Sequence, residues 1–545
     1  MCATSRRLTQ QRHLEDCQSA VAHKVRSYRR PVRTGSCNRC SRAGILPRPA
    51  ERPPVVSADD FRRLAAEGYN RIPVVREVLS DLDTPLSVYL KRADGPYSYL
   101  FESVEGGEQW RRYSIIGLPA RRVITLRGNV LEIRDTGEVV EQRELEDPLA
   151  EIEALRQSYR VPRLPGLPGF TGGLVGYFGF ETIGYIEPRL AGAAPRDTLG
   201  TPDVQLMLSE EVAVFDNLKG RLYLIVHADP AEPQAYARAL RRLDQLAFRL
   251  RHAGSGYPEV LDPASLSEQD FVSGFTREGF EAAVRRCQEY IQAGDAFQIV
   301  LSQRLSVPFR ARPVDVYRAL RALNPSPYLF FLDLGPTQVV GSSPEILVRV
   351  SEGRVTLRPI AGTRPRGATP EEDALLEREL LADPKECAEH LMLIDLGRND
   401  VGRVAKTGTV RVPERMGIER YSHVMHIVSQ VEGELREGLT PIDVLKATFP
   451  AGTLSGAPKI RALEIIQELE PIRRNIYAGA VGYLGWWGDM DTAIAIRTAV
   501  IHGGMLHVQA GAGIVHDSDP AREWEETLSK GRALFRAVAQ AASGL

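Results

Sequence analysis

The sequence predicts a mixed α and β protein with more than one compact region, on three observations. The chain has 545 residues, whereas one hydrophobic core rarely serves more than about 250–300 residues. Strand-like patterns occur both before residue 145 and after residue 297. Apolar residues recur at helical spacing over 234–252 and 278–293. Hydrophobic residues make up 43% and charged residues 26% of the chain, which excludes an overall disordered, collagen-like or disulfide-rich protein.

The first 55 residues form a separate compositional segment. They hold twelve Lys and Arg against three acidic residues, and four of the six cysteines. We expect residues 1–55 to be a basic, disordered N-terminal extension or the product of an over-extended start site. An organelle targeting peptide is less favoured, because two acidic residues and several prolines interrupt any amphipathic period. Cys37 and Cys40 lack a second pair at zinc-finger spacing, so we interpret these thiols as incidental.

Residues 56–255 are expected to form an N-terminal region. Its predicted elements are, in order, a helix capped by Ser57, strands over 85–145 with a hairpin that turns at Gly128-Asn129, and a helix over 234–252. The polar stretch that follows, which contains Gly, Ser and Pro and runs to about residue 273, is the predicted main boundary.

Residues 273–545 are expected to form a C-terminal region in which helices and strands alternate. Its predicted elements include a helix over 278–293 and strands over 297–307, 339–350 and 354–359. Gly173–Gly179 resembles Gly479–Gly485, which predicts a similar, closely packed strand in each region. Chance similarity among the 47 glycines is the alternative.

Net charge, cysteine usage and the absence of certain motifs exclude several classes of function. The formal net charge of -1 argues against a nucleic-acid or anionic-membrane partner, and the longest apolar stretch, 478–487, is too short to span a bilayer. Only Cys287 and Cys387 lie beyond the N-terminal segment, which is typical of a reduced, cytoplasmic enzyme. Neither cysteine lies in a nucleophile motif and no phosphate-binding Gly-rich loop with Lys is present, so a glutaminase or ATP-cleaving centre is not expected.

Two predicted helices share a design that points to a cation. Each begins with Asp-Pro and carries two glutamates three residues apart: Asp383, Glu386 and Glu389 in the first, and Asp519, Glu523 and Glu526 in the second. Such pairs are more often solvated surface residues. Here, however, they border apolar stretches that should pack inward, where like charges need a cation. Oxygen ligands alone favour Mg²⁺.

A glycine-rich stretch, 510–516, precedes the second of these helices. It lacks the third glycine of a dinucleotide-binding fingerprint, so a Rossmann fold is disfavoured. Its backbone amides can bind an anion such as a carboxylate. A tight turn without a ligand remains the alternative.

Six motifs, in matching order, resemble those of the chorismate-utilising enzymes. They are 341–345, 360–367, 389–400, 421–426, 452–459 and 511–527. The resemblance covers about residue 57 to the C-terminus and is strongest to the anthranilate synthase component I group. It implies an α+β fold, a two-region sandwich of antiparallel β-sheets with helices packed outside. In that fold residues 273–545 are the chorismate-binding catalytic region, and residues 56–255 carry a tryptophan-sensing segment.

The resemblance also implies roles for individual residues. The implied Mg²⁺ ligands are Glu389 and Glu526, supported by Glu386 and Glu523. The implied substrate contacts are Gly362 and Thr363 for the ring carboxylate, and Tyr477, Arg497, Gly511, Ala512 and Gly513 for the enolpyruvyl carboxylate. The residues implied to act on the reacting ring are Glu345 as general acid, His426 as proton-transfer group and Thr453. Without the motif, His426 would be interpreted as a buried structural histidine.

The implied reaction is addition of ammonia to chorismate with release of pyruvate and formation of anthranilate. Ala361 favours free ammonia as the nucleophile, because the related aminodeoxychorismate synthases have Lys at this position. Aminodeoxychorismate, isochorismate or salicylate synthesis, and a non-catalytic sensor with the same fold, remain alternatives. Because no glutaminase nucleophile is present, the expected partner is a glutamine amidotransferase subunit (anthranilate synthase component II) in a heterotetramer.

Two short segments resemble the tryptophan-sensing segment of the family. They are 100–105, with Phe101 where Leu is usual, and 324–329, with Leu329 where Met is common. The implied tryptophan contacts are Ser103, Pro327, Tyr328 and Leu329, and feedback inhibition by tryptophan is expected. A strand and a proline turn without a ligand are the alternative.

Overall fold

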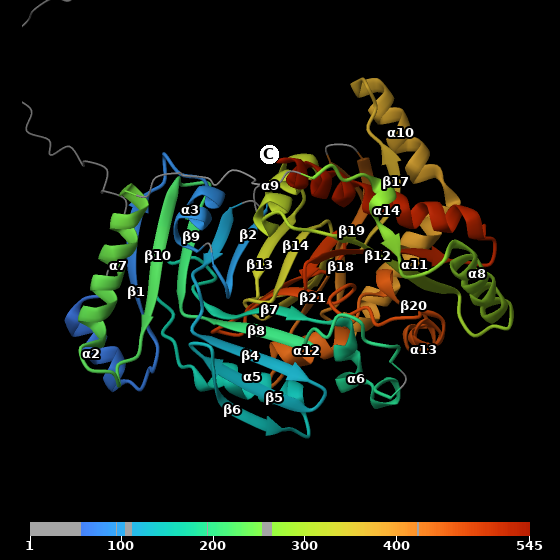
Figure 1. The fold of residues 1–545 in the computed structure, drawn as a ribbon. Helices are drawn as coiled ribbons and strands as arrows, with labels where there is room; N and C mark the ends of the chain where they lie inside the picture. The colour runs from blue at the N-terminus through green and yellow to red at the C-terminus, as the bar shows by residue number, and fades with distance from the viewer. Residues whose placement is uncertain (1–55, 94, 104–111, 193, 253–263, 422–423) are drawn as a thin grey trace, which may run out of the picture. The chain divides into compact units, whose positions relative to one another are not determined.

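The computed structural model describes residues 56–93, 95–103, 112–192, 194–252, 264–421 and 424–545 (Figure 1). All described residues belong to one compact unit, and the fold below is that of these residues. The predictions for residues 1–55 and for most of the predicted linker, 253–263, lie outside the described residues. Among the described helices, none is long and apolar enough to cross a membrane.

Two antiparallel sheets of twelve strands each form the framework. The first sheet follows the order β1-β10-β9-β3-β2-β13-β14-β23-β24-β12-β11, with β20 paired to β12. Its strands are β1 (Ile72–Leu79), β2 (Ser98–Glu102), β3 (Tyr113–Gly117), β9 (Glu211–Asp216), β10 (Arg221–Ala228), β11 (Val272–Ser273), β12 (Gln298–Pro308), β13 (Tyr328–Asp333), β14 (Thr337–Ser343), β20 (Gly456–Ala457), β23 (Thr498–His502) and β24 (Met505–Ile514).

The second sheet follows the order β17-β19-β16-β15-β22-β21-β7-β8-β4-β5-β6, with β18 paired to β19. Its strands are β4 (Arg122–Arg127), β5 (Val130–Asp135), β6 (Glu138–Glu144), β7 (Gly173–Phe178), β8 (Val204–Ser209), β15 (Ile346–Ser351), β16 (Arg354–Leu357), β17 (Ile360–Pro365), β18 (Arg411–Arg420), β19 (Val424–Glu434), β21 (Ala480–Gly485) and β22 (Met490–Ile494).

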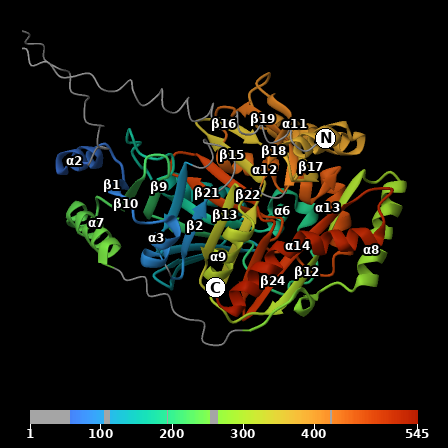
Figure 2. The ribbon, with the colours of Figure 1, turned by 90° about the horizontal axis from the view of Figure 1, so that it is seen from above.

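The sheets pack against each other and helices cover their outer faces. Residues of both sheets, such as Tyr177 and Phe330, share one buried cluster. The helices are α2 (Ala58–Ala66), α3 (Pro85–Arg92), α5 (Pro148–Ser158), α6 (Ile183–Ile186), α7 (Ala235–His252), α8 (Arg277–Gln292), α9 (Pro313–Leu323), α10 (Pro370–Ala382), α11 (Pro384–Gly402), α12 (Pro441–Thr448), α13 (Lys459–Leu469) and α14 (Pro520–Ser543). Figures 1 and 2 show α7 and α14 outside the strands, where they pack on β10 and β24. The predicted α+β sandwich is thus confirmed.

Each sheet combines strands from before and after the predicted boundary. In the first sheet β2 pairs with β13. In the second sheet β7 pairs with β21, and Gly176 lies opposite Gly482. These paired strands are the two similar glycine segments of the sequence. A Cβ atom at Gly176 would lie 2.0 Å from a backbone oxygen of β8, and one at Gly482 equally close to a backbone oxygen of β22, so both positions require glycine.

Most of the predicted elements that rest on local signals are confirmed. Ser57 caps α2, Gly128 and Asn129 turn the hairpin between β4 and β5, and both long predicted helices are present as α7 and α8. Asp383 and Asp519 cap α11 and α14 through their side chains.

Two predictions were wrong. Residues 85–92 form helix α3 rather than a strand, because Thr84 and Ser87 make a reciprocal capping box and Pro85 lies in the first turn between them. Residues 339–350 are not one strand but two, β14 and β15, which belong to different sheets. The chain passes between the sheets at Pro344 and Glu345, where proline cannot donate a ladder hydrogen bond.

Candidate active site

Helices α11 and α14 bring the four predicted glutamates into electrostatic range of one another. Burial raises the pKa of Glu389, and the charges of Glu386 and Glu526 raise it further. Burial also raises the pKa of Glu523, to which Glu526 adds. Glu526 therefore lies close enough to Glu389 for its charge to act on that carboxyl.

Two side chains that the sequence analysis missed complete this acidic cluster. Lys530 lies one turn after Glu526 on α14, pairs with it at 2.8 Å and donates a 2.8 Å hydrogen bond to the carbonyl of Gly511. Gln298, at the start of β12, hydrogen-bonds Glu389 and packs against Gly513, where a Cβ atom would approach its amide to 2.5 Å. The glycine strand β24 and the glutamates thus belong to one site. Lys530 could have been found from its i,i+4 spacing to Glu526, whereas Gln298 gives no sequence signal.

The acidic cluster suits a hard cation. Within the described ranges, no three His, Cys, Asp or Glu side chains lie close enough together to hold a metal ion. However, Glu389 and Glu523 are partly buried carboxylates whose pKa values are raised, so an added cation would stabilise their charged forms, and carboxylate oxygens are donors that Mg²⁺ prefers. The residues therefore fit Mg²⁺, and the assignment of Glu389 and Glu526 as its ligands stays a prediction.

Strands β17 and β19 position His426 beside Gly362 and Thr363. The Nδ1 atom of His426 lies 2.9 Å from the Gly362 carbonyl oxygen and 3.1 Å from the Thr363 hydroxyl. Because a carbonyl only accepts, Nδ1 carries the proton and Nε2 presents a lone pair. Burial lowers the pKa of His426, so its ring is neutral and able to accept a proton.

Gly362 links this strand pair to the acidic cluster. Its φ angle is +67°, and it lies at an irregularity in the pairing of β17 with β19. A Cβ atom here would lie 3.2 Å from a carboxylate oxygen of Glu386. Glu386 also receives Arg364 at 3.5 Å. The conformation and the space at this position both require glycine.

Glu345 lies between the sheets with Thr453, as a buried carboxyl. Its side chain accepts a 3.3 Å hydrogen bond from the hydroxyl of Thr453, which is part of the short 3-10 helix η4 (Gly452–Leu454). Burial raises the pKa of Glu345 to about 8, so the group is a carboxylic acid at neutral pH. Both residues line a cavity of about 40 Å³, together with Leu393 and Leu396 of α11.

Tyr477 and Arg497 supply groups suited to a carboxylate. A Cβ atom at Gly511 would lie 3.1 Å from the Tyr477 hydroxyl, so Tyr477 lies against the glycine strand. Arg497 adopts a φ of +48°, and its charge contributes to the lowered pKa of His426. Burial lowers the pKa of Arg497, and an anionic ligand would compensate its charge.

The predicted site residues thus form connected groups. The acidic cluster contacts β24 by way of Lys530 and Gln298. It contacts β17 at Gly362. Ala512 lies between the two glycines of β24, paired with Leu301 of β12. Glu345 and Thr453 contact each other, and their cavity is lined by the same helix that carries Glu389.

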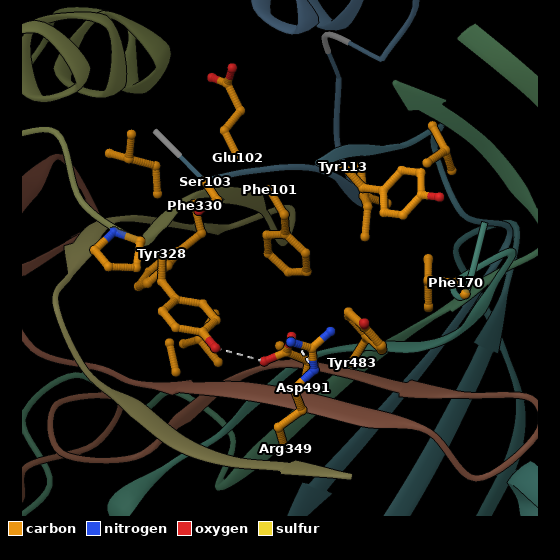
Figure 3. Close-up of a pocket in the computed structure, with 18 of the residues that line it drawn as sticks. Phe101, Glu102, Ser103, Tyr113, Phe170, Tyr328, Phe330, Arg349, Tyr483 and Asp491 are labelled. Atoms are coloured by element: carbon orange, nitrogen blue, oxygen red, sulfur yellow. Dashed lines mark hydrogen bonds and ion pairs between the residues drawn. The ribbon is translucent and has the colours of Figure 1, made fainter. Parts of the chain in front are cut away.

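A second cavity, of about 180 Å³, lies apart from these groups and is lined by strands of both sheets. It is lined by all four residues predicted to contact tryptophan, Ser103, Pro327, Tyr328 and Leu329. Figure 3 shows aromatic rings around it, including Phe101 and Tyr483.

Polar groups occupy one side of this cavity. The Tyr328 hydroxyl donates a 3.0 Å hydrogen bond to Asp491, and Arg349 lies 3.6 Å from the same carboxylate (Figure 3). Glu102 also lines the cavity but its carboxylate binds Arg321 of α9. The cavity therefore combines an aromatic lining with a charged side, which suits an aromatic amino acid.

Comparison with known proteins agrees with this architecture. A model of the chorismate binding enzyme family matches residues 99–536. The crystal structure of anthranilate synthase component I from Streptococcus pneumoniae TIGR4 superposes with a TM-score of 0.71 at 40% identity, covering 84% of this chain and 99% of that chain. The menaquinone-specific isochorismate synthase MenF of Escherichia coli, at 18% identity and a TM-score of 0.64, covers 88% of this chain and 98% of its own and shares the fold. The chain belongs to the chorismate binding enzyme family.

Sequence relatives define the group within that family. Anthranilate synthase component 1 of Pseudomonas putida is 59% identical over 487 residues, which is 89% of this chain and 99% of that protein. The protein of the same name from Neisseria meningitidis serogroup A is 55% identical over 496 residues, which is 90% of this chain and all of that protein. The chain therefore belongs to the anthranilate synthase component 1 group of the family.

Proposed function

We propose that this chain is the subunit of an anthranilate synthase that converts chorismate and ammonia to anthranilate and pyruvate. The observation that carries the proposal is the contrast between two titratable groups. Glu345 is buried with a pKa of about 8, and His426 is buried with a lowered pKa. A protonated carboxylic acid and a neutral imidazole are the acid and the base that this reaction needs at neutral pH.

In the proposed mechanism the chain first binds the two carboxylates of chorismate. Arg497, Tyr477 and the amides of 511–513 receive the enolpyruvyl carboxylate, and Gly362 and Thr363 lie at the ring carboxylate. The hydroxyl of Thr453 lines the ring beside Glu345. Two anionic groups held at fixed places orient the ring for attack at C2.

Glu345 then donates its proton to the C4 hydroxyl, which leaves as water while ammonia forms a bond to C2. The ammonium group formed at C2 loses one proton, which restores the protonated Glu345. His426 accepts the proton from C2 at Nε2, and the bond between C3 and the enolpyruvyl oxygen breaks. The released enolpyruvate takes up a proton to give pyruvate, and the ring becomes aromatic. Mg²⁺ held by Glu389 and Glu526, with Glu386 and Glu523 behind them, would neutralise the ring carboxylate and draw electron density from C2.

The alternative activity is synthesis of aminodeoxychorismate, isochorismate or salicylate, the products of related enzymes. Ala361 supports ammonia as the nucleophile, because alanine carries no amine that could attack C2. Product identification by chromatography and mass spectrometry separates anthranilate from aminodeoxychorismate, isochorismate and salicylate.

We further propose a partner, a location and an inhibitor. A glutamine amidotransferase subunit, in a heterotetramer, would supply ammonia. The two cysteines of the described residues, Cys287 and Cys387, are unpaired, which supports a reduced cytoplasmic location. Tryptophan is proposed to bind in the 180 Å³ cavity and to inhibit the enzyme.

The deciding experiment supplies the isolated chain with chorismate, Mg²⁺ and ammonium at alkaline pH. We expect anthranilate fluorescence to appear without a partner subunit and to require Mg²⁺. Folded protein that binds Mg²⁺ and yields no anthranilate would refute the proposed activity.

A further inference from the structure

An ion pair buried beneath the candidate active site has no part in the proposed chemistry. Glu470 follows α13 and Arg474 lies four residues later, with side chains only 3% and 1% exposed. Two hydrogen bonds join them, from Arg474 Nε to Glu470 Oε2 at 2.9 Å and from Nη2 to Oε1 at 2.6 Å. Burying such a pair gives little net stability, because both ions lose their hydration. Its presence calls for another explanation.

The pair binds the backbone of two segments, one that carries Thr453 and one, strand β12, that pairs with the glycine strand. Arg474 Nη1 donates to the carbonyl of Leu454 at 2.7 Å, the residue after Thr453. Its Nη2 donates to the carbonyl of Val300 at 2.8 Å. Glu470 Oε1 accepts from both the amide and the hydroxyl of Ser302, each at 2.8 Å.

The residues held on β12 lie directly opposite the glycine strand. Val300 pairs with Gly513 and Ser302 with Gly511. The Ser302 hydroxyl also accepts a 2.9 Å hydrogen bond from Gln509 of β24. The ion pair therefore fixes, through one strand, the backbone amides proposed to receive the enolpyruvyl carboxylate.

The same guanidinium supports Tyr477. Its central carbon lies 5.7 Å from the ring centroid of Tyr477 and 4.7 Å from that of Phe180. Both distances are within the range of cation–π attraction. Arg474 thus contacts three places in the site: the ring of Tyr477, the carbonyl next to Thr453, and strand β12, which pairs with the glycine strand.

We propose that Glu470 and Arg474 are positioning residues that set the geometry of the carboxylate-binding side of the chorismate pocket. The inference rests on the proposed function. The planar guanidinium uses several donors at fixed angles, so it can hold three segments in one arrangement. Misplacement of substrate-binding groups by about 1 Å costs on the order of 100-fold in catalysis.

The test replaces the pair with apolar side chains of similar size, as Glu470→Leu/Arg474→Met. Exchange of a buried ion pair for apolar side chains can itself be neutral, but here Leu454, Val300 and Ser302 lose hydrogen-bond partners, so we expect a folded variant with a lowered thermal midpoint. With ammonium as donor, we expect the KM for chorismate to rise about tenfold or more while kcat falls much less. Arg474→Lys, which keeps the charge but not the fork of donors, should raise KM by a smaller factor.

The control is the pair Glu153 and Arg156 on α5, with side chains 9% and 8% exposed. Glu153→Leu/Arg156→Met should leave KM unchanged. A wild-type KM in the folded Glu470→Leu/Arg474→Met variant overturns the inference. If that variant does not fold, a wild-type KM in Arg474→Lys overturns it instead. Absence of anthranilate from the wild-type chain would refute the proposed function rather than this inference.

Discussion

Replacement of Glu345 by glutamine tests whether this carboxyl is a buried acid. Glutamine keeps the size of the side chain and its hydrogen bond from Thr453 but does not titrate. The folded pKa of Glu345 is about 8 against an ordinary value of 4.5. The folded protein therefore binds this proton more tightly than the unfolded chain does. The stability that the protonated group contributes is complete below pH 4.5 and is lost as the pH rises to 8.

The two pKa values differ by about 3.5, which corresponds to about 5 kcal/mol at full ionisation. This loss affects only the wild type. Thermal unfolding of both proteins between pH 5 and pH 9 measures it, because other titrating groups affect both alike. We expect the Glu345→Gln variant to gain stability relative to the wild type as the pH rises. As a control, Glu437, whose side chain is 92% exposed, should give no such divergence when changed to Gln.

Activity provides a second measure on the same variant. Removal of a general acid typically lowers kcat by about 10²- to 10⁴-fold. Parallel stability curves for wild type and Glu345→Gln across this pH range would refute the buried-acid assignment. A variant with wild-type kcat would refute the catalytic role even if the stability curves diverge.

Three further predictions concern the other parts of the site. Gly362→Ala should lower the thermal midpoint and raise the KM for chorismate, because the added methyl group meets Glu386. The control is Gly438→Ala, at a φ of +82° with open space around it. It should cost about 1 kcal/mol of backbone strain and leave KM unchanged. Glu526→Gln should weaken Mg²⁺ binding measured by calorimetry, whereas the same change at the neighbouring Glu525 should not; equal Mg²⁺ affinity in both would contradict the ligand assignment. Tyr328→Phe should weaken tryptophan inhibition several-fold without changing kcat, and unaltered inhibition would argue against that cavity as the inhibitor site.

Local signals in the sequence predicted much of the secondary structure but not its pairing. Asp383 and Asp519 identify the starts of α11 and α14, because a cap and a proline act within one turn. The position of Glu345 between the sheets was missed, since 339–350 has the composition of one continuous strand. The direct pairing of β7 with β21 depends on contacts across some 300 residues of sequence, which no local pattern encodes.

Candidate site residues could be named from the sequence where they belong to motifs. Single residues outside the motifs that support the site could not. The four glutamates of α11 and α14 were singled out by their spacing and their apolar neighbours, and the choice of Glu389 and Glu526 as metal ligands came from the family resemblance. In the structure the charge of Glu526 acts on Glu389. Glu470 and Arg474 were overlooked, because a Glu and an Arg four residues apart are typical of exposed helix surfaces. Only the tertiary structure shows that this pair is buried and that its partners are backbone groups of distant strands.

The junctions β2–β13 and β7–β21 have a consequence for dividing the chain. A fragment that ends before residue 255 would leave β2 and β7 with unsatisfied backbone donors and acceptors along one side. The complementary fragment would expose β13 and β21 in the same way. Free edges of this length promote aggregation, so each fragment alone should be insoluble. Produced together, the two should cap each other's edges and restore the enzyme by complementation.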